Sequence, residues 1–214
     1  VNFKKIYKEF YSNISYGRDI KKKYDFLLSL KKKSDNLQRV IRTIKFLKFK
    51  KKKYKILDVG SGFGIFPIEL SKLVQNLDIH VIEPDRNNIK FMKKFKLKVK
   101  SKFIENFQSS VKYDLITLNK VIEHIDNPEK ILKRLKKNMV KNSIVYIEVP
   151  DGEGASKSKE GLFREEFFVD HHHIFSRKSF KDLLSRCELQ TLVIKRIIEP
   201  SKKYTLYAFA KLNI

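Results

Sequence analysis

The sequence YKILDVGSGFGIF at residues 54–66 decides the fold. Its first half is apolar, as in a buried strand, and ends on the acid Asp58. Three glycines with a spacing of two follow at once, and the apolar spacing of residues 67–74 predicts a helix directly after them. A strand, a glycine turn and a helix N-terminus in this order place backbone N–H groups where a ligand can approach closely.

A second acid follows the glycines by about 20 residues, where an open α/β sheet can use it to hold ribose hydroxyls. It is Glu83, at the end of the apolar run 79–82. A dinucleotide fingerprint would need a small residue in place of Ile65, and two acids beside the turn disfavour a pyrophosphate. The pattern favours a ligand with a ribose and positive charge but no phosphate. S-adenosylmethionine meets this description.

The sequence resembles the class I S-adenosylmethionine-dependent methyltransferases in residues 56–66, 81–85 and 113–125. This resemblance implies an α/β fold with a Rossmann-like, seven-stranded, mostly parallel sheet, an antiparallel C-terminal hairpin and helices on both faces. The alternative is a generic α/β turn whose glycines only permit tight packing.

Ligands of open α/β sheets bind at the carboxyl ends of the strands, so the candidates follow each predicted strand. The resemblance implies an acid against the adenine amino group after the third strand, and cofactor contacts at the methionine end after the fourth. The predicted cofactor-binding residues are Asp58, Gly60, Ser61, Gly62, Gly64, Glu83, Pro84, Glu105, Asn106 and Asn119.

Two domains are predicted, a helical N-terminal cap at residues 1–50 and the methyltransferase domain at residues 51–214. The resemblance implies that such a cap covers the cofactor and helps to bind the acceptor; a plain packing extension is the alternative. The short connector 199–202 predicts an antiparallel hairpin. Strands are expected near 54–59, 78–83, 97–103, 113–118, 143–149, 189–198 and 203–211, and helices near 64–75, 85–95, 128–138 and 177–187.

The formal net charge of +24 comes mostly from lysine and would suit nucleic acid, an anionic membrane or a phosphorylated substrate. We favour lysines spread over solvated helix faces, because the lysine tracts occur all along the chain and arginine is scarce. Enzymes that methylate base amino groups usually carry an Asn/Asp-Pro-Pro-aromatic signature after the fourth strand. This chain has Leu-Asn-Lys-Val at residues 118–121, which also disfavours nucleic acid.

The remaining composition predicts a cytoplasmic protein. The single cysteine, Cys187, rules out an internal disulfide and suits a reducing compartment, where we expect it to be packed. No apolar run approaches the roughly 20 residues of a membrane span, and no signal-peptide pattern is visible.

The polar run REEFFVDHHHIFS at residues 164–176 follows the fifth predicted strand and a flexible loop expected at 151–156. It resembles the acid-His-x-His-x-Phe-Ser/Thr stretch of small methyltransferases that act on sugars, quinones and other small hydroxylated acceptors. In an extended backbone, His171 and His173 would share one face. Ser176 is the expected N-cap of the following helix.

Three roles are open for His171 and His173: general base for the acceptor, ligand of a metal together with a nearby carboxylate, or structural hydrogen bonding that closes the pocket. We predict the catalytic role and no metal site. The neighbouring Glu123-His124 pair is expected to brace its turn, as it does more often in this family.

The predicted reaction is transfer of the S-adenosylmethionine methyl group to an oxygen or nitrogen of a small hydroxylated acceptor. A sugar or nucleotide-linked sugar of surface-polysaccharide synthesis fits best, and phosphates on it would give Arg164 and some lysines a purpose. The alternatives are an RNA or protein methyltransferase that uses the basic surface, or a non-catalytic binding module. The sequence does not specify the oligomeric state.

Overall fold

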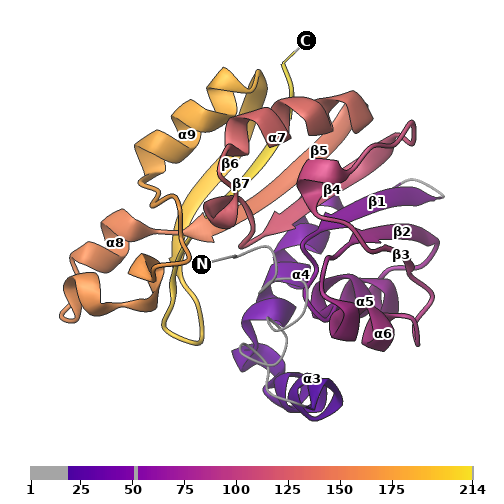
Figure 1. Cartoon of the computed structure of the whole chain (residues 1–214), viewed down its shortest axis with the longest axis horizontal. Coiled ribbons are helices and arrows are strands. Elements are labelled where there is room, and N and C mark those ends of the chain that lie inside the picture. Colours follow the sequence, from indigo (N-terminus) through magenta and orange to yellow (C-terminus); the bar gives the residue numbers. More distant parts are fainter. Residues whose placement is uncertain (1–18, 51–52, 214) are drawn as a thin grey trace. The chain divides into compact units, whose positions relative to one another are not determined.

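The computed structural model of the chain describes residues 19–50 and 53–213 (Figure 1). The chain divides into two compact units, the first ending at Gln108 and the second beginning at Ser109. Each unit carries a part of the sheet with its own helices. The division into an N-terminal cap at 1–50 and a catalytic domain stays a prediction.

The first unit contains three parallel strands, in the order β3-β2-β1. Asp58 near the end of β1 lies opposite Val81 of β2, so the strand ends that precede the glycine turn and Glu83 lie at the same edge. The elements are α3 (Ile20–Ser29), α4 (Asp35–Leu47), β1 (Tyr54–Val59), α5 (Ile65–Leu73), β2 (Leu77–Ile82), α6 (Arg86–Met92) and β3 (Lys98–Lys100), with 3-10 turns η1 (Lys31–Lys33) and η2 (Ile104–Asn106).

Side-chain caps start α4 and α6 of this unit. Ser34 accepts a hydrogen bond from Leu37 N at the start of α4. Asp85 accepts from Asn87 N and Asn88 N at the start of α6. Residues 1–18 of the predicted helical cap lie outside the described residues.

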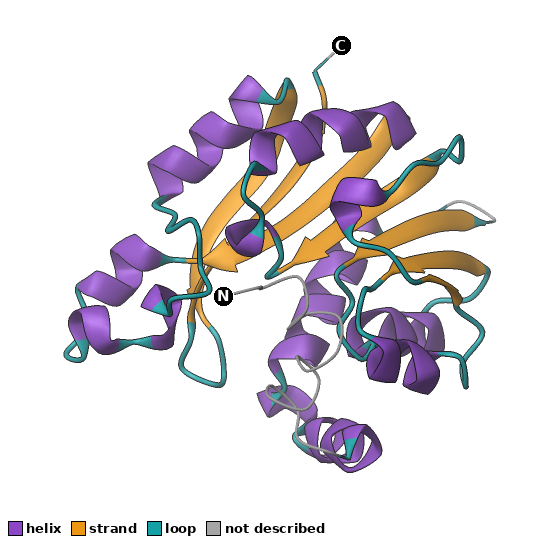
Figure 2. Cartoon of the chain, in the orientation of Figure 1, coloured by secondary structure: helices purple, strands orange, loops and turns teal. Residues whose placement is uncertain are grey.

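The second unit contributes strands in the order β4-β5-β7-β6. β4 and β5 are parallel, while β7 is antiparallel to both β5 and β6. Figure 2 shows α7 and α9 lying across these strands, and Arg186 of α9 pairs with Glu129 of α7 at 3.0 Å. The main elements are β4 (Tyr113–Asn119), α7 (Pro128–Leu135), β5 (Met139–Pro150), α8 (Gly152–Ser156), α9 (Arg177–Arg186), β6 (Leu189–Ile198) and β7 (Tyr204–Leu212), with 3-10 turns η3 (Ile122–His124), η4 (Lys136–Asn138), η5 (Gly161–Phe163) and η6 (Glu165–Phe167).

The seven strands have the order β3-β2-β1-β4-β5-β7-β6, which confirms the predicted seven-stranded, mostly parallel sheet with an antiparallel C-terminal hairpin. The third strand covers Lys98–Lys100 and is shorter than the predicted strand at 97–103. The helix expected at 128–138 ends at Leu135 and continues as a 3-10 turn. Asn127 and Ser176 cap α7 and α9 as their sequence positions suggest.

The loop expected at 151–156 is instead the short helix α8. Asp151, fully buried, accepts from Gly154 N at 3.0 Å and pairs with Arg196 of β6. These contacts fix a segment whose two glycines suggested flexibility. Among the described residues, no helix is long and apolar enough to cross a membrane.

Candidate cofactor and acceptor sites

The glycine turn after β1 satisfies its own backbone. Gly60, Gly62 and Gly64 have φ values of 65°, 57° and 80°, a region that favours glycine. Each of the three N–H groups donates to a protein oxygen, so the turn does not hold them ready for a phosphate. The acceptors are Ile82 O at 2.8 Å for Gly60, Glu83 Oε2 at 2.8 Å for Gly62, and Ser61 O at 3.0 Å for Gly64.

Glu83 lies inside the turn rather than in bulk water, with its residue only 4% exposed. Its second oxygen, Oε1, accepts from Asp85 N at 2.9 Å and from Asn88 Nδ2 at 3.4 Å. Burial raises the pKa of this carboxyl to about 8, although the three donors oppose the shift. A ligand that brings two hydroxyl donors would favour the ionised carboxylate and bind to it.

Asp58 is buried at the end of β1 and accepts a hydrogen bond from the Ser61 hydroxyl across the turn. This contact fixes Ser61 and leaves an acid directly below the turn. The two predicted acids therefore lie where the sequence placed them, one before the turn and one inside it. Both favour a cationic nucleoside over a pyrophosphate.

Gly64 has a packing reason of its own. A Cβ atom added there would lie 2.5 Å from Met92 Sδ of α6, in addition to the strain of its φ of 80°. The structure thus gives Gly64 a role in tight packing, which was the alternative to cofactor binding. Its contact with a cofactor stays a prediction.

Tyr24 of α3 links the N-terminal helices to the glycine turn. Its ring packs edge-on against Phe63 of the turn at 6.4 Å, and its hydroxyl donates to Glu69 of α5 at 2.7 Å. Lys72 donates to the same hydroxyl at 2.9 Å. Helix α3 therefore belongs to the packed core of the first unit, together with Ile65, Ile68 and Phe91.

The other predicted cofactor residues occupy strand ends and turns. Pro84 lies between Glu83 and the cap of α6, and Glu105 and Asn106 lie on η2, where Glu105 is half-buried and Asn106 exposed. Asn119 is the last residue of β4, in the second unit. Their contacts with a cofactor stay predictions.

The histidine run does not form the expected extended strand, so its side chains do not alternate between two faces. His171 N donates to Phe168 O at 3.0 Å, and the backbone N–H groups of His172 and His173 both donate to Glu123 O, at 2.8 and 3.1 Å. The run therefore lies over η3, attached through the main chain of Glu123.

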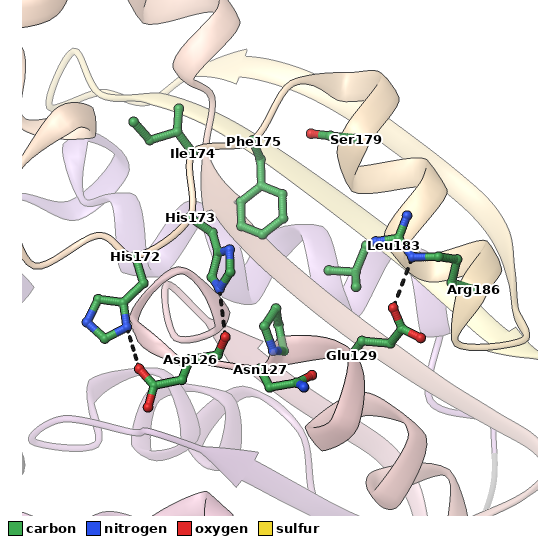
Figure 3. Close-up of a pocket in the computed structure, with 11 residues that line it drawn as sticks. Asp126, Asn127, Glu129, His172, His173, Ile174, Phe175, Ser179, Leu183 and Arg186 are labelled. Carbon is green, nitrogen blue, oxygen red and sulfur yellow. Dashed lines mark hydrogen bonds and ion pairs between the residues drawn. The ribbon is translucent and has the colours of Figure 1, made fainter.

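His173 and His172 hold this attachment with their side chains (Figure 3). His173 Nε2 lies 2.9 Å from Ile125 O and 3.3 Å from Asp126 O, both of which can only accept. His172 Nδ1 lies 2.9 Å from Asp126 Oδ1. These contacts match the structural role that the sequence left open.

His171 points elsewhere, toward His124. The two ring centroids lie 4.9 Å apart, and His171 Nδ1 lies 2.9 Å from Glu166 O. Because a carbonyl oxygen only accepts, Nδ1 carries the proton and Nε2 keeps a lone pair. The fully buried Glu123 carboxylate joins these two rings, and sequence reasoning had assigned it only to bracing the turn.

A cavity of about 450 Å³ lies beside His173, between the start of α7 and one side of α9. Figure 3 shows Phe175 and Leu183 among its apolar lining groups, with the Glu129–Arg186 pair at one end. This volume falls within the range of small-molecule pockets.

Arg164 is engaged by the protein itself. Its guanidinium donates to both oxygens of Glu166, at 3.0 and 3.3 Å, and to Lys202 O at 2.7 Å. It also lies 4.7 Å over the ring of Tyr204. These contacts hold the segment to Lys202 and Tyr204, and the use of Arg164 for a substrate phosphate stays a prediction.

A family model described as a methyltransferase domain matches residues 24–192. No curated protein matches the sequence. Solved structures match the fold at low sequence identity. The plantazolicin methyltransferase BpumL in complex with SAH has a TM-score of 0.71 at 20% identity over 94% of this chain and 93% of its own. The Burkholderia thailandensis 1,6-didemethyltoxoflavin-N1-methyltransferase, with bound 1,6-didemethyltoxoflavin and S-adenosylhomocysteine, has a TM-score of 0.69 at 13% identity over 96% and 86%.

Proposed function

Because the chain belongs to the methyltransferase-domain family and uses S-adenosylmethionine as its methyl donor, we propose that it methylates an oxygen or nitrogen of a small hydroxylated acceptor. The sulfonium is already a reactive donor, so the protein accelerates the transfer mainly by positioning the two reactants. The nucleophile attacks the methyl carbon in line as the bond to sulfur breaks.

The observation that carries this function is the Glu83 carboxylate inside the glycine turn. Its oxygens accept from Gly62 N and Asp85 N, which fixes their positions, and we propose that they also accept from the two ribose hydroxyls. Asp58, buried below the same turn, is suited to the positive end of the cofactor. Gly60, Ser61, Gly64 and Pro84 complete this half of the proposed site, and Glu105, Asn106 and Asn119 are its proposed outer contacts.

We assign proton removal from the acceptor to His171 in the metal-free protein. Its Nε2 lone pair is available because Nδ1 faces the Glu166 carbonyl, whereas His173 uses Nε2 to hold Ile125 and Asp126. The two predicted catalytic histidines thus divide into a base and a positioning residue. An acceptor that is already a neutral amine needs no base, and then His171 only orients it.

The acceptor class is supported by two kinds of neighbour. The Burkholderia thailandensis enzyme has bound 1,6-didemethyltoxoflavin. Coclaurine N-methyltransferase is bound to N-methylheliamine and SAH, with a TM-score of 0.65 at 12% identity over 82% of this chain and 70% of its own. A sugar or nucleotide-linked sugar of surface-polysaccharide synthesis remains our proposed acceptor, in the cytoplasm, with Arg164 and some of the lysines facing any phosphate.

An acceptor screen with detection of S-adenosylhomocysteine tests the function, using wild-type protein and Glu83→Gln. We expect turnover with a small hydroxylated or amine acceptor and a loss of more than about tenfold in cofactor affinity for the variant. Calorimetry without cofactor binding would overturn the enzyme assignment in favour of a binding module. Turnover confined to RNA, with strongly salt-dependent RNA binding, would favour the nucleic-acid alternative.

A further inference from the structure

Three donor groups outside the glycine turn converge beneath the histidine run. Glu123 and His124 come from η3, directly after β4, and His171 comes from the segment that follows η6. One ligand atom from each side chain lies within 4.8 Å of the other two. The main-chain bonds from His172 and His173 to Glu123 O keep the two segments together.

Both imidazoles present a lone pair of the same kind. His124 Nδ1 lies 2.8 Å from Asp170 O, as His171 Nδ1 lies 2.9 Å from Glu166 O. Each carbonyl requires the proton on Nδ1, so Nε2 is the unprotonated nitrogen in the neutral ring. Burial keeps the pKa of His124 below its ordinary value, which favours that neutral form. Metal-binding histidines are oriented in this way, with the second nitrogen donating to a carbonyl or carboxylate.

Glu123 supplies a buried carboxylate to this cluster. The residue is fully buried, and neither oxygen makes a well-formed hydrogen bond to any residue that the structure describes. Burial raises the pKa of this carboxyl to about 7, opposed by the charge of Lys120 and by its own backbone N–H. Burying a carboxylate without partners costs several kcal/mol, and such groups in proteins are paired or coordinate metals.

We propose that Glu123, His124 and His171 bind one divalent transition-metal ion, such as Zn²⁺ or Co²⁺. Two imidazole nitrogens and one carboxylate oxygen are the donor set of open zinc and iron sites, and three protein ligands leave a position for water or an acceptor oxygen. Ligand atoms about 2.0–2.2 Å from the metal lie about 3–3.5 Å apart, so the set closes by roughly an ångström on binding. Mg²⁺ and Ca²⁺ prefer oxygen ligands and fit it less well.

The charges around the cluster suit a cation. Asp170 places Oδ2 at 3.6 Å from His124 Nδ1, and Glu123 adds a second carboxylate, against the ammonium of Lys120. Lys120 Nζ also donates to Thr205 Oγ1 at 2.8 Å, which draws it toward β7.

The test titrates the chelator-treated full chain with Co²⁺ and Zn²⁺, followed by calorimetry and by the visible absorption of Co²⁺. We expect one ion per chain, with affinity at least about tenfold weaker in both Glu123→Gln and His171→Asn. His172→Asn is the matched control from the same histidine run, because His172 is exposed and faces Asp126 instead. It should bind as the wild type does.

Circular dichroism of each metal-free variant shows whether it folds. If His171→Asn does not fold, His171→Gln takes its place. The proposal is overturned if the wild type binds no ion, if it binds Mg²⁺ but neither Co²⁺ nor Zn²⁺, or if His172→Asn abolishes binding while Glu123→Gln does not. If the wild type binds no ion, Glu123 would instead share a proton within the cluster. None of these readouts requires methyl transfer, so they are independent of the proposed acceptor.

Discussion

Affinity for the nucleoside should depend on pH through Glu83. The pKa of the ligand-free carboxyl is about 8, because the residue is only 4% exposed. Two ribose hydroxyls donate most strongly to the ionised form, in which both oxygens accept. In the limit where only this form binds the ribose, the observed dissociation constant is the intrinsic value divided by the ionised fraction. That fraction is about one half at pH 8, about one tenth at pH 7 and about one hundredth at pH 6.

The dissociation constant should therefore rise about fiftyfold between pH 8 and pH 6, equivalent to about 2.3 kcal/mol. The suitable probe is 5′-methylthioadenosine, which carries the ribose but lacks an α-amino group. In S-adenosylmethionine that amino group titrates in the same window, at about 7.7–8.0 in peptides, and would mask the effect. Calorimetry in buffers of different ionisation enthalpy would also report the proton released on binding.

Glu83→Gln is the control, because it keeps an acceptor for Gly62 N but cannot ionise. We expect weaker binding with a flat pH profile. The groups that face Glu83 are Asn88, which does not titrate here, and the carboxyl of Asp85. A dissociation constant that is constant from pH 8 to pH 6 in the wild type, or an equal slope in the variant, would refute the reasoning.

Four smaller predictions concern stability and reactivity. Gly64→Ala should lower the free energy of unfolding by about 2–4 kcal/mol, because of the strain at its φ and the contact with Met92. Adding Met92→Ala to the same chain should recover part of this loss, which a double-mutant cycle in urea would measure. Tyr24→Phe should cost about 1 kcal/mol in the same assay, because it removes the hydroxyl that donates to α5. Asp151→Ala should cost about 3 kcal/mol, since it removes a helix cap and one partner of an ion pair, and a change below about 0.5 kcal/mol would contradict this. Cys187 should react with a thiol reagent at pH 8 at least about a hundredfold more slowly than a free thiol, because burial raises its pKa to about 11, and fast labelling of the folded protein would contradict the packing.

The first unit could be predicted from sequence because its signals are local. The strand at 54–59 and the glycine turn follow from residues within one short stretch, and Glu83 follows from a fixed distance along the chain. What the sequence could not show is that Glu83 itself bonds Gly62 N, which depends on the parallel register of β1 and β2.

The histidine run was harder because its partners are distant in sequence. Alternation along an extended strand would pair His171 with His173, but the backbone bends and attaches to Glu123 O, nearly fifty residues earlier. No local pattern records such a contact. The signal that could have found it was Glu123 itself, an acid inside an apolar segment, where a buried carboxylate calls for a partner.

Glu83 and Glu123 show why burial alone does not decide the use of a carboxylate. Both are buried, and burial raises the pKa of both, to about 8 and about 7. Glu83 already has three N–H donors, so its oxygens are fixed in place and accept further hydroxyls without having to move. Glu123 has no well-formed donor among the described residues but has two imidazoles within 4.8 Å, and these bring lone pairs rather than protons. A hydroxyl suits the first arrangement, whereas a cation suits the second.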